Sequence, residues 1–196
     1  MKTIASFALL AALGAATALG GCRSTQDVLR IGEGGERNAG PCPRAFALYD
    51  AARIVEFRGE GESFANVGFT GEIASVRSLC RYVGDNPITG DVDITFNLGR
   101  GPAASESEAT YQYWVAIMRK NIAVMDKQTF PLTVSFPAGT DRITTTVTVE
   151  DYEIPRASDT TSGANFEVVV GFEVTPEQRA FNADGRRFRV NAGQQG

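Results

Sequence analysis

The feature of this sequence that most constrains its fold is an alternation of apolar and polar residues with a period of two. In residues 91–98 the apolar positions are Val92, Ile94, Phe96 and Leu98, and the residues between them are polar. Residues 130–136, 143–150 and 166–174 repeat the pattern. Successive side chains of a strand point to opposite faces, so this alternation predicts strands with one buried and one solvated face.

Three less regular segments also favour strands, at 45–57, 72–83 and 111–125. The last is apolar on both faces, which is typical of a central or fully covered strand. Pro131 predicts that its own strand lies at a sheet edge. Glycine- and proline-rich turns separate these units, and we therefore expect an all-β fold, an antiparallel immunoglobulin-like β-sandwich of about seven strands.

One short C-terminal helix is expected after these strands. Thr175-Pro176-Glu177-Gln178 combines an N-cap threonine, a proline at the first helical position and a glutamine three residues after the cap. This order predicts a capping box at the start of a helix. Gly185 is placed to end it.

The chain begins with Met1 and Lys2, followed by an uncharged stretch rich in alanine, leucine and glycine. This pattern predicts a secretory signal peptide over residues 1–21. The alternative is a transmembrane helix, which needs about 20 apolar residues. The apolar part here, 4–19, is short and contains much alanine and glycine, which favours the signal peptide.

The end of that stretch, Leu19-Gly20-Gly21-Cys22, resembles the lipobox of bacterial lipoproteins. The resemblance implies cleavage before Cys22, a diacylglyceryl thioether on its sulfur and acylation of the new amino terminus. Several acyl chains give stable membrane attachment where one does not. In Gram-negative lipoproteins an aspartate after the cysteine favours inner-membrane retention. Arg23 stands there, so the resemblance implies the periplasmic face of the outer membrane.

The organisation that follows has three further parts. Residues 22–41 are polar and glycine-rich, which predicts a lipidated N-terminus and flexible tether. Residues 42–191 are expected to form the β-sandwich domain, and 192–196 a tail.

The sequence contains three cysteines. With Cys22 lipidated, Cys42 and Cys80 remain in an oxidising compartment, where they are the available pair for an intramolecular disulfide. The alternatives are two unpaired thiols or a metal-binding pair. The sequence has no histidine, and two cysteines without histidine make a poor metal site.

The lack of histidine also excludes Ser-His-Asp and Cys-His catalysis. A nucleophile elbow, a P-loop and a dinucleotide fingerprint are absent too. The formal net charge of −4 argues against nucleic acid as a partner. We therefore expect no catalytic residue, no metal and no cofactor apart from the covalent lipid. Asp91 and Asp93 could bind calcium or share a proton, but the solvated face of a strand explains them more simply.

Two groups of residues are candidates for binding. Phe64 and Phe69 lie in a glycine-containing loop over 59–70, a composition found in binding loops, although such rings also tuck into cores. The second group consists of C-terminal arginines, Arg179, Arg186, Arg187 and Arg189. Arginines pair well with the phosphate of anionic lipids or with an acidic patch on a partner. Solvation and helix-dipole complementation are the alternative.

Parts of the domain resemble an uncharacterised group of Gram-negative envelope lipoproteins. The resemblance rests on Glu62–Gly71, Arg77–Asp85, Thr160–Phe172 and Thr175–Phe181. It implies no known activity. The function predicted is a non-catalytic binding or structural role at the cell envelope, with an envelope protein as partner. The alternatives are a carrier of an apolar ligand or lipid, which needs a cavity of roughly 300 Å³ or more, and a carboxylate-dependent enzyme.

Overall fold

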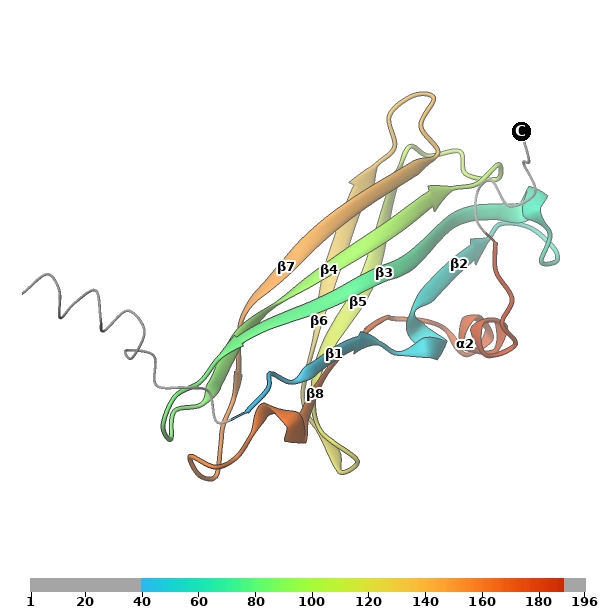
Figure 1. Ribbon diagram of the computed structural model, residues 1–196. Coiled ribbons are helices and arrows are strands. Elements are labelled where there is room, and N and C mark those ends of the chain that lie inside the picture. The colour runs from blue at the N-terminus through green and yellow to red at the C-terminus, as the bar shows by residue number, and fades with distance from the viewer. Residues whose placement is uncertain (1–39, 189–196) are drawn as a thin grey trace, which may run out of the picture. The chain divides into compact units, whose positions relative to one another are not determined.

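The computed structural model describes residues 40–188, which form two β-sheets packed face to face (Figure 1). The strands are β1 (Arg44–Ala47), β2 (Arg53–Phe57), β3 (Val67–Arg81), β4 (Ile88–Arg100), β5 (Glu108–Arg119), β6 (Ala123–Ser135), β7 (Arg142–Ile154) and β8 (Phe166–Phe172). Short 3₁₀ turns lie at η1 (Tyr49–Ala51), η2 (Phe64–Asn66) and η3 (Gly163–Asn165), and the helix is α2 (Pro176–Ala183).

One sheet has the strand order β1-β8-β5-β6 and the other β2-β3-β4-β7. The predicted all-β sandwich with one short helix is thus confirmed, with eight strands. Neighbouring strands are antiparallel except β1 and β8, which run parallel. Two sheets of four strands in this order differ from the ABED and CFG sheets of an immunoglobulin constant domain.

The core lies between the inner faces of the two sheets. Val92, Ile94, Phe96 and Leu98 are all buried, as the alternation in 91–98 predicts. The Phe96 ring lies 5.1 Å from that of Tyr113 and 5.6 Å from that of Phe172, both on the opposite sheet. Burying side chains of this size stabilises the fold by about 1.5–3 kcal/mol each.

Two predicted strands are wrong in extent. The segment 45–57 is interrupted by η1, so that β1 joins one sheet and β2 the other. The segment 111–125 contains a turn after Arg119, in which Asn121 adopts φ 58°. Asparagine tolerates the left-handed conformation, which allows a tight turn without glycine.

The positions of the other predicted strands agree with the sheet order. β5 lies between β8 and β6, as expected for a strand that is apolar on both faces. β6, which contains Pro131, lies at a sheet edge, so its prediction is also confirmed.

Cys42, just before β1, and Cys80, near the end of β3, form the predicted disulfide, with sulfur atoms 1.96 Å and Cα atoms 5.6 Å apart. The buried Tyr82 hydroxyl lies within hydrogen-bonding distance of the Gly40 and Pro41 carbonyl oxygens. It also accepts a hydrogen bond from the Gly163 N–H at 3.2 Å. This end of the domain, called the disulfide end below, is therefore held by both covalent and polar links.

Helix α2 begins with the predicted capping box. The Gln178 N–H donates to the Thr175 hydroxyl at 3.2 Å, and the Thr175 N–H donates to the Gln178 side chain at 2.9 Å. Gly185 follows the helix with φ 73°, and the Arg186 N–H donates back to the Phe181 carbonyl. These bonds satisfy groups that a short helix leaves unpaired at its ends.

Several predictions fall on residues outside the described range. These are the signal peptide, the lipobox with Cys22, the tether before Gly40, Arg189 and the tail. Within 40–188, no helix is long and apolar enough to cross a membrane.

Candidate functional site

The register of the β2-β3-β4-β7 sheet places two rows of mostly polar residues on its outer face. One row runs from Arg53 through Glu72 and Asn97 to Thr144, and the other from Val55 through Thr70 and Gly99 to Arg142. The row between them contains the buried Leu98, which points into the sandwich. Because side chains alternate along a strand, the two flanking rows point outward.

Helix α2 covers the free edge of β2 beside these rows. The Asn182 side-chain amide donates to the Asp50 and Arg53 carbonyl oxygens, both at 2.8 Å. The Gln178 side chain donates to the Val55 carbonyl oxygen at 2.9 Å. The bonds to Arg53 and Val55 satisfy acceptors that the edge strand β2 would otherwise expose, and the bond to Asp50 joins α2 to η1.

A small aromatic cluster fixes the segment after α2. Phe181 packs on Val55 and Val67, and Phe188 stacks on Phe181 with ring centroids 5.9 Å apart. Phe57 lies against both rings, edge-on. The chain between Phe181 and Phe188 is therefore held against the sheet, and it brings Arg186 and Arg187 to the outer rows.

Together these elements enclose a pocket of about 210 Å³, called the arginine pocket below. Its lining includes four arginines, Arg53, Arg142, Arg186 and Arg187, and a single carboxylate, Glu72. Thr70, Asn97, Thr144 and Asn182 add uncharged polar side chains to the lining. The remaining lining residues are apolar or glycine: Ile54, Val55, Gly71, Leu98, Gly99, Ile143 and Phe188. Such a concentration of guanidinium groups favours an anion, because arginine binds oxyanions through pairs of hydrogen bonds.

Arg53 is the unusual member of this group. Its Nε and Nη2 atoms are buried without a hydrogen-bond partner, the only such side-chain atoms found within residues 40–188. The guanidinium lies over the Tyr49 ring at 5.1 Å, which orients it but uses no donor. Unsatisfied buried polar atoms are destabilising, so their presence calls for an explanation beyond packing.

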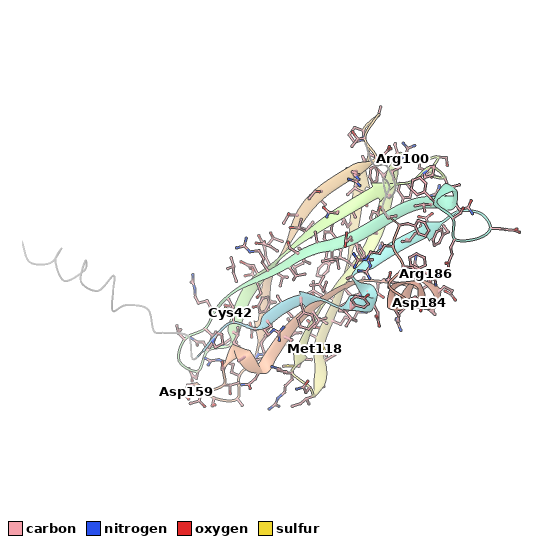
Figure 2. All side chains as sticks on the ribbon, turned by 45° about the vertical axis from the view of Figure 1, so that its right-hand side comes forward. Cys42, Arg100, Met118, Asp159, Asp184 and Arg186 are labelled. Atoms are coloured by element: carbon pink, nitrogen blue, oxygen red, sulfur yellow. A yellow bond between two sulfur atoms is a disulfide. The ribbon has the colours of Figure 1, made fainter. Side chains whose placement is uncertain are left out.

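The other arginines differ in how they are compensated. Arg186 forms ion pairs with Glu62 and Asp184, and Figure 2 shows it beside Asp184 at the end of α2. Arg142 and Arg187 are exposed, and neither belongs to an ion pair formed among the described residues. The pocket therefore combines the half-buried Arg53, the ion-paired Arg186, and Arg142 and Arg187, whose exposed side chains can move toward a ligand.

The structure separates the predicted binding residues. Arg186 and Arg187 line the pocket, whereas Arg179 is exposed on α2 outside it. Phe64 is 38% exposed in η2 and does not line the pocket. Phe69 is only 3% exposed and stacks on Phe136 in the core, so its assignment to a binding surface is wrong. The apolar alternation of its strand outweighs the loop-like composition around it.

Two of the four pocket arginines, Arg53 and Arg142, were not predicted from the sequence. Each begins a strand, and only the pairing of β2, β3, β4 and β7 brings them to one surface. Their exact register depends on contacts distant in sequence, so no local pattern identifies them.

Asp91 and Asp93, the predicted carboxylate pair, accept hydrogen bonds from the neighbouring strand β7. Asp93 accepts a hydrogen bond from the Thr148 hydroxyl at 2.8 Å, and Asp91 accepts one from the Asp151 N–H at 3.0 Å. Over residues 40–188, no group of three histidine, cysteine, aspartate or glutamate side chains is placed to hold a metal ion.

The pocket lies on the outside of a sheet, whereas aromatic rings occupy the space between the sheets. Tyr113 stacks on Phe130 at 5.4 Å, and Tyr111 lies 6.1 Å from Phe172. The outer pocket is thus the better-supported place for a ligand. Comparisons with known proteins add no assignment: no protein-family model matches this chain, and neither does any curated protein.

Proposed function

We propose that this protein is a lipid-anchored envelope lipoprotein whose domain binds an acidic group of a partner protein, without catalysis, in the arginine pocket. The observation that carries the proposal is the half-buried Arg53, whose Nε and Nη2 are buried without a hydrogen-bond partner among residues 40–188, in a pocket lined by three further arginines. A carboxylate placed there would accept hydrogen bonds from Arg53 and gain from the surrounding positive charge.

The size of the pocket favours a side chain of a larger partner. At about 210 Å³ it is smaller than the roughly 300–1,000 Å³ typical of small-molecule sites. A single aspartate or glutamate side chain needs far less room than a cofactor or a lipid. Exposed Arg142 and Arg187 at its rim can meet the surface around such a side chain.

Membrane anchoring is the second part of the proposal, and it rests on the lipobox-like Leu19-Gly20-Gly21-Cys22. Arg23 supports the outer membrane as the destination, with the domain in the periplasm. The Cys22→Ala variant should lose acyl labelling and membrane retention. A variant that still fractionates with membranes, with its precursor uncut, would support the transmembrane alternative.

The pocket is tested with inorganic phosphate as a probe and the full-length lipidated protein in detergent. We expect phosphate to raise the thermal unfolding temperature of the wild type and of Arg179→Gln, but not of Arg142→Gln. Both variants lose one positive charge, and only the second changes the pocket, so general charge effects cancel. No stabilisation of the wild type, or equal stabilisation of all three proteins, would refute an anion site.

The partner is tested by chemical crosslinking in envelopes, followed by purification of the lipoprotein. We expect one protein to be captured by the wild type and Arg179→Gln and to be reduced with Arg142→Gln. Capture that is unaffected by Arg142→Gln would place the partner elsewhere. Phospholipid bound in place of protein would favour a lipid phosphate as the ligand and contradict the acidic-side-chain proposal.

A further inference from the structure

The β5–β6 hairpin ends in a tip, residues 119–125, that exposes large apolar side chains. Ile122, Val124 and Met125 are 69%, 56% and 43% exposed. Every residue from 121 to 129 is exposed, so this part of the hairpin extends beyond the sandwich core. Single exposed apolar residues are ordinary on protein surfaces, but three within four positions at a protruding turn form a patch.

The tip is held in a defined position. The Ile122 N–H donates to the Arg119 carbonyl at 3.0 Å, which closes the turn. The Lys120 N–H donates to the Asn165 carbonyl at 2.9 Å, and Arg119 pairs with Phe166 of β8. The exposed side chains are thus presented by a fixed hairpin.

The tip lies beside the point where the chain enters the domain. A Cβ atom on Gly163 would clash with the Pro41 carbonyl oxygen and would lie 3.1 Å from the Cys42 carbonyl carbon. The η3 turn therefore touches the entering chain on one side and, through Asn165, the tip on the other. Figure 1 shows the β5–β6 turn at the end where β1 begins, and Figure 2 labels Met118 and Cys42 at that end.

The charge of the tip suits an anionic surface. Residues 118–125 contain Arg119 and Lys120 and no acidic residue. Asp126, which follows the tip, is negatively charged and accepts a hydrogen bond from Gln128, and Lys127 pairs with Glu173. Over residues 118–127 the basic residues Arg119, Lys120 and Lys127 outnumber this one acid. Asp85, in the turn between β3 and β4, and Asp159, labelled in Figure 2, belong to other loops at this end and are not part of the hairpin.

The turn at the opposite end has a different character. Between β6 and β7, Phe136 is buried in the core, and the sequence after it, Pro137-Ala138-Gly139-Thr140-Asp141, contains no large apolar residue and one acid. The apolar, basic tip is therefore a feature of one end of the sandwich and not of its long hairpins in general.

We infer that the hairpin tip is a second membrane contact, which enters the headgroup region of the bilayer that holds the Cys22 lipid. This inference rests on the proposed lipid anchor. Gly40 follows Cys22 by 18 positions, so their separation cannot exceed roughly 60 Å. At a membrane interface the aliphatic side chains meet the acyl boundary while Arg119 and Lys120 meet phosphates. The two contacts together would fix the orientation of the domain on the membrane.

The test places an environment-sensitive fluorophore on the tip. Ala123→Cys introduces a thiol there and keeps Ile122, Val124 and Met125. The disulfide and the lipid occupy the native cysteines, so the new thiol is the labelling site. The full-length lipidated protein is reconstituted into vesicles of phosphatidylethanolamine and phosphatidylglycerol. Ala138→Cys, labelled in the same way at the opposite end, is the matched control.

We expect the fluorophore at position 123 to shift its emission to the blue and to be quenched by lipids with a nitroxide at the headgroup or upper acyl chain. Quenching at 123 should exceed quenching at 138 by at least about twofold, because only an inserted tip meets the nitroxide. Replacing Ile122, Val124 and Met125 by serine should abolish the difference.

Quenching and flotation together decide between the tip contact and the lipid anchor. Equal quenching at the two positions would overturn the inference. A blue shift at 123 without quenching by lipid would also overturn it, and would indicate contact with a second copy or another protein. Vesicle flotation, measured in parallel, tests the anchor separately. Protein that floats but shows no tip quenching refutes only the tip contact, whereas protein that does not float refutes the anchor.

Discussion

Two partly buried arginines, one at each end of the sandwich, make opposite use of their hydrogen-bond donors. Arg156, at the disulfide end, lies over the Tyr82 ring at 4.9 Å and donates to backbone carbonyls of Val83, Gly84, Asn86, Asp159 and Thr161. Arg53, in the arginine pocket, lies over the Tyr49 ring at 5.1 Å, yet its Nε and Nη2 have no partner.

The difference shows which arginine serves the fold. Arg156 satisfies carbonyl groups of two loops, so its donors replace regular secondary structure. The buried Nε and Nη2 of Arg53 satisfy none among the described residues, and a buried donor without a partner lowers stability. A ligand that accepts hydrogen bonds from these two atoms would remove that cost.

The largest effect should come from opening the covalent link at the disulfide end. Its cysteines are separated by 38 residues, and removing the cross-link by Cys42→Ser and Cys80→Ser should lower the free energy of unfolding by about 3–4 kcal/mol. Urea unfolding measures the loss. Phosphate binding, compared at a temperature where both proteins are folded, should remain. A parallel loss of binding would mean that the two ends do not act independently.

Arg156→Met should give the next largest effect, a loss of about 2–3 kcal/mol, because several carbonyl groups lose a charged donor at once. Hydrogen exchange should show weaker protection of amides in 82–87 and 155–162. Arg179→Gln, on the exposed side of α2, is the control and should change stability little. A small effect of Arg156→Met would mean that water replaces its donors without penalty, and the contrast with Arg53 would weaken.

Arg53→Met should have the opposite sign. Removing a guanidinium with two buried unpaired donors should stabilise the fold, and losing its contact with the Tyr49 ring should destabilise it. The net result should be a rise of about 1 kcal/mol in the free energy of unfolding. The same variant should no longer respond to phosphate. Thermal unfolding with and without phosphate measures both effects. A variant less stable than the wild type in the absence of anions would show that Arg53 is a structural residue.

The sequence predicts the elements of this fold better than their ends. The alternation in 91–98 and 166–174 reflects burial of one face, which is a local property, and the capping box depends on four adjacent residues. The turn at Asn121 lacks glycine and proline, so the predicted strand 111–125 runs through it. The break at η1 arises because β1 pairs with β8 in one sheet and β2 pairs with β3 in the other. The pairing of β1 with β8 depends on residues far along the chain, so the local sequence does not predict the break.

In the arginine pocket, too, local sequence predicts some residues, whereas others depend on contacts distant in the chain. Arg186 and Arg187 stand out in sequence because basic residues cluster after a predicted helix. Arg53 and Arg142 are 89 residues apart, and only β3 and β4 between them bring their strands into one surface. The burial of the Arg53 Nε and Nη2 atoms results from tertiary packing. No sequence pattern predicts which arginine will have unpaired donors.

The smallest effect tests the helix that builds the pocket. Glu177 lies in the first turn of α2, where its own backbone N–H and the Thr175 side chain lower the carboxyl pKa below its ordinary value of 4.5. A carboxyl group whose pKa is lower in the folded than in the unfolded protein stabilises the fold at pH values above its unfolded-state pKa. This stabilisation disappears as the pH falls through the folded-state pKa. Wild type should therefore be more stable than Glu177→Gln at pH 7, and the difference should vanish in acid.

The comparison must be between the two proteins and not along one pH curve. Hydrogen bonding to Arg58 also lowers the pKa of Glu106, so wild-type stability falls in acid for a second reason with the same sign. That contribution is present in both proteins and cancels in their difference. A difference that persists unchanged below pH 4 would show that Glu177 acts through its shape and not its charge. The pocket end would then depend on α2 packing alone, as the cluster of Phe57, Phe181 and Phe188 already allows.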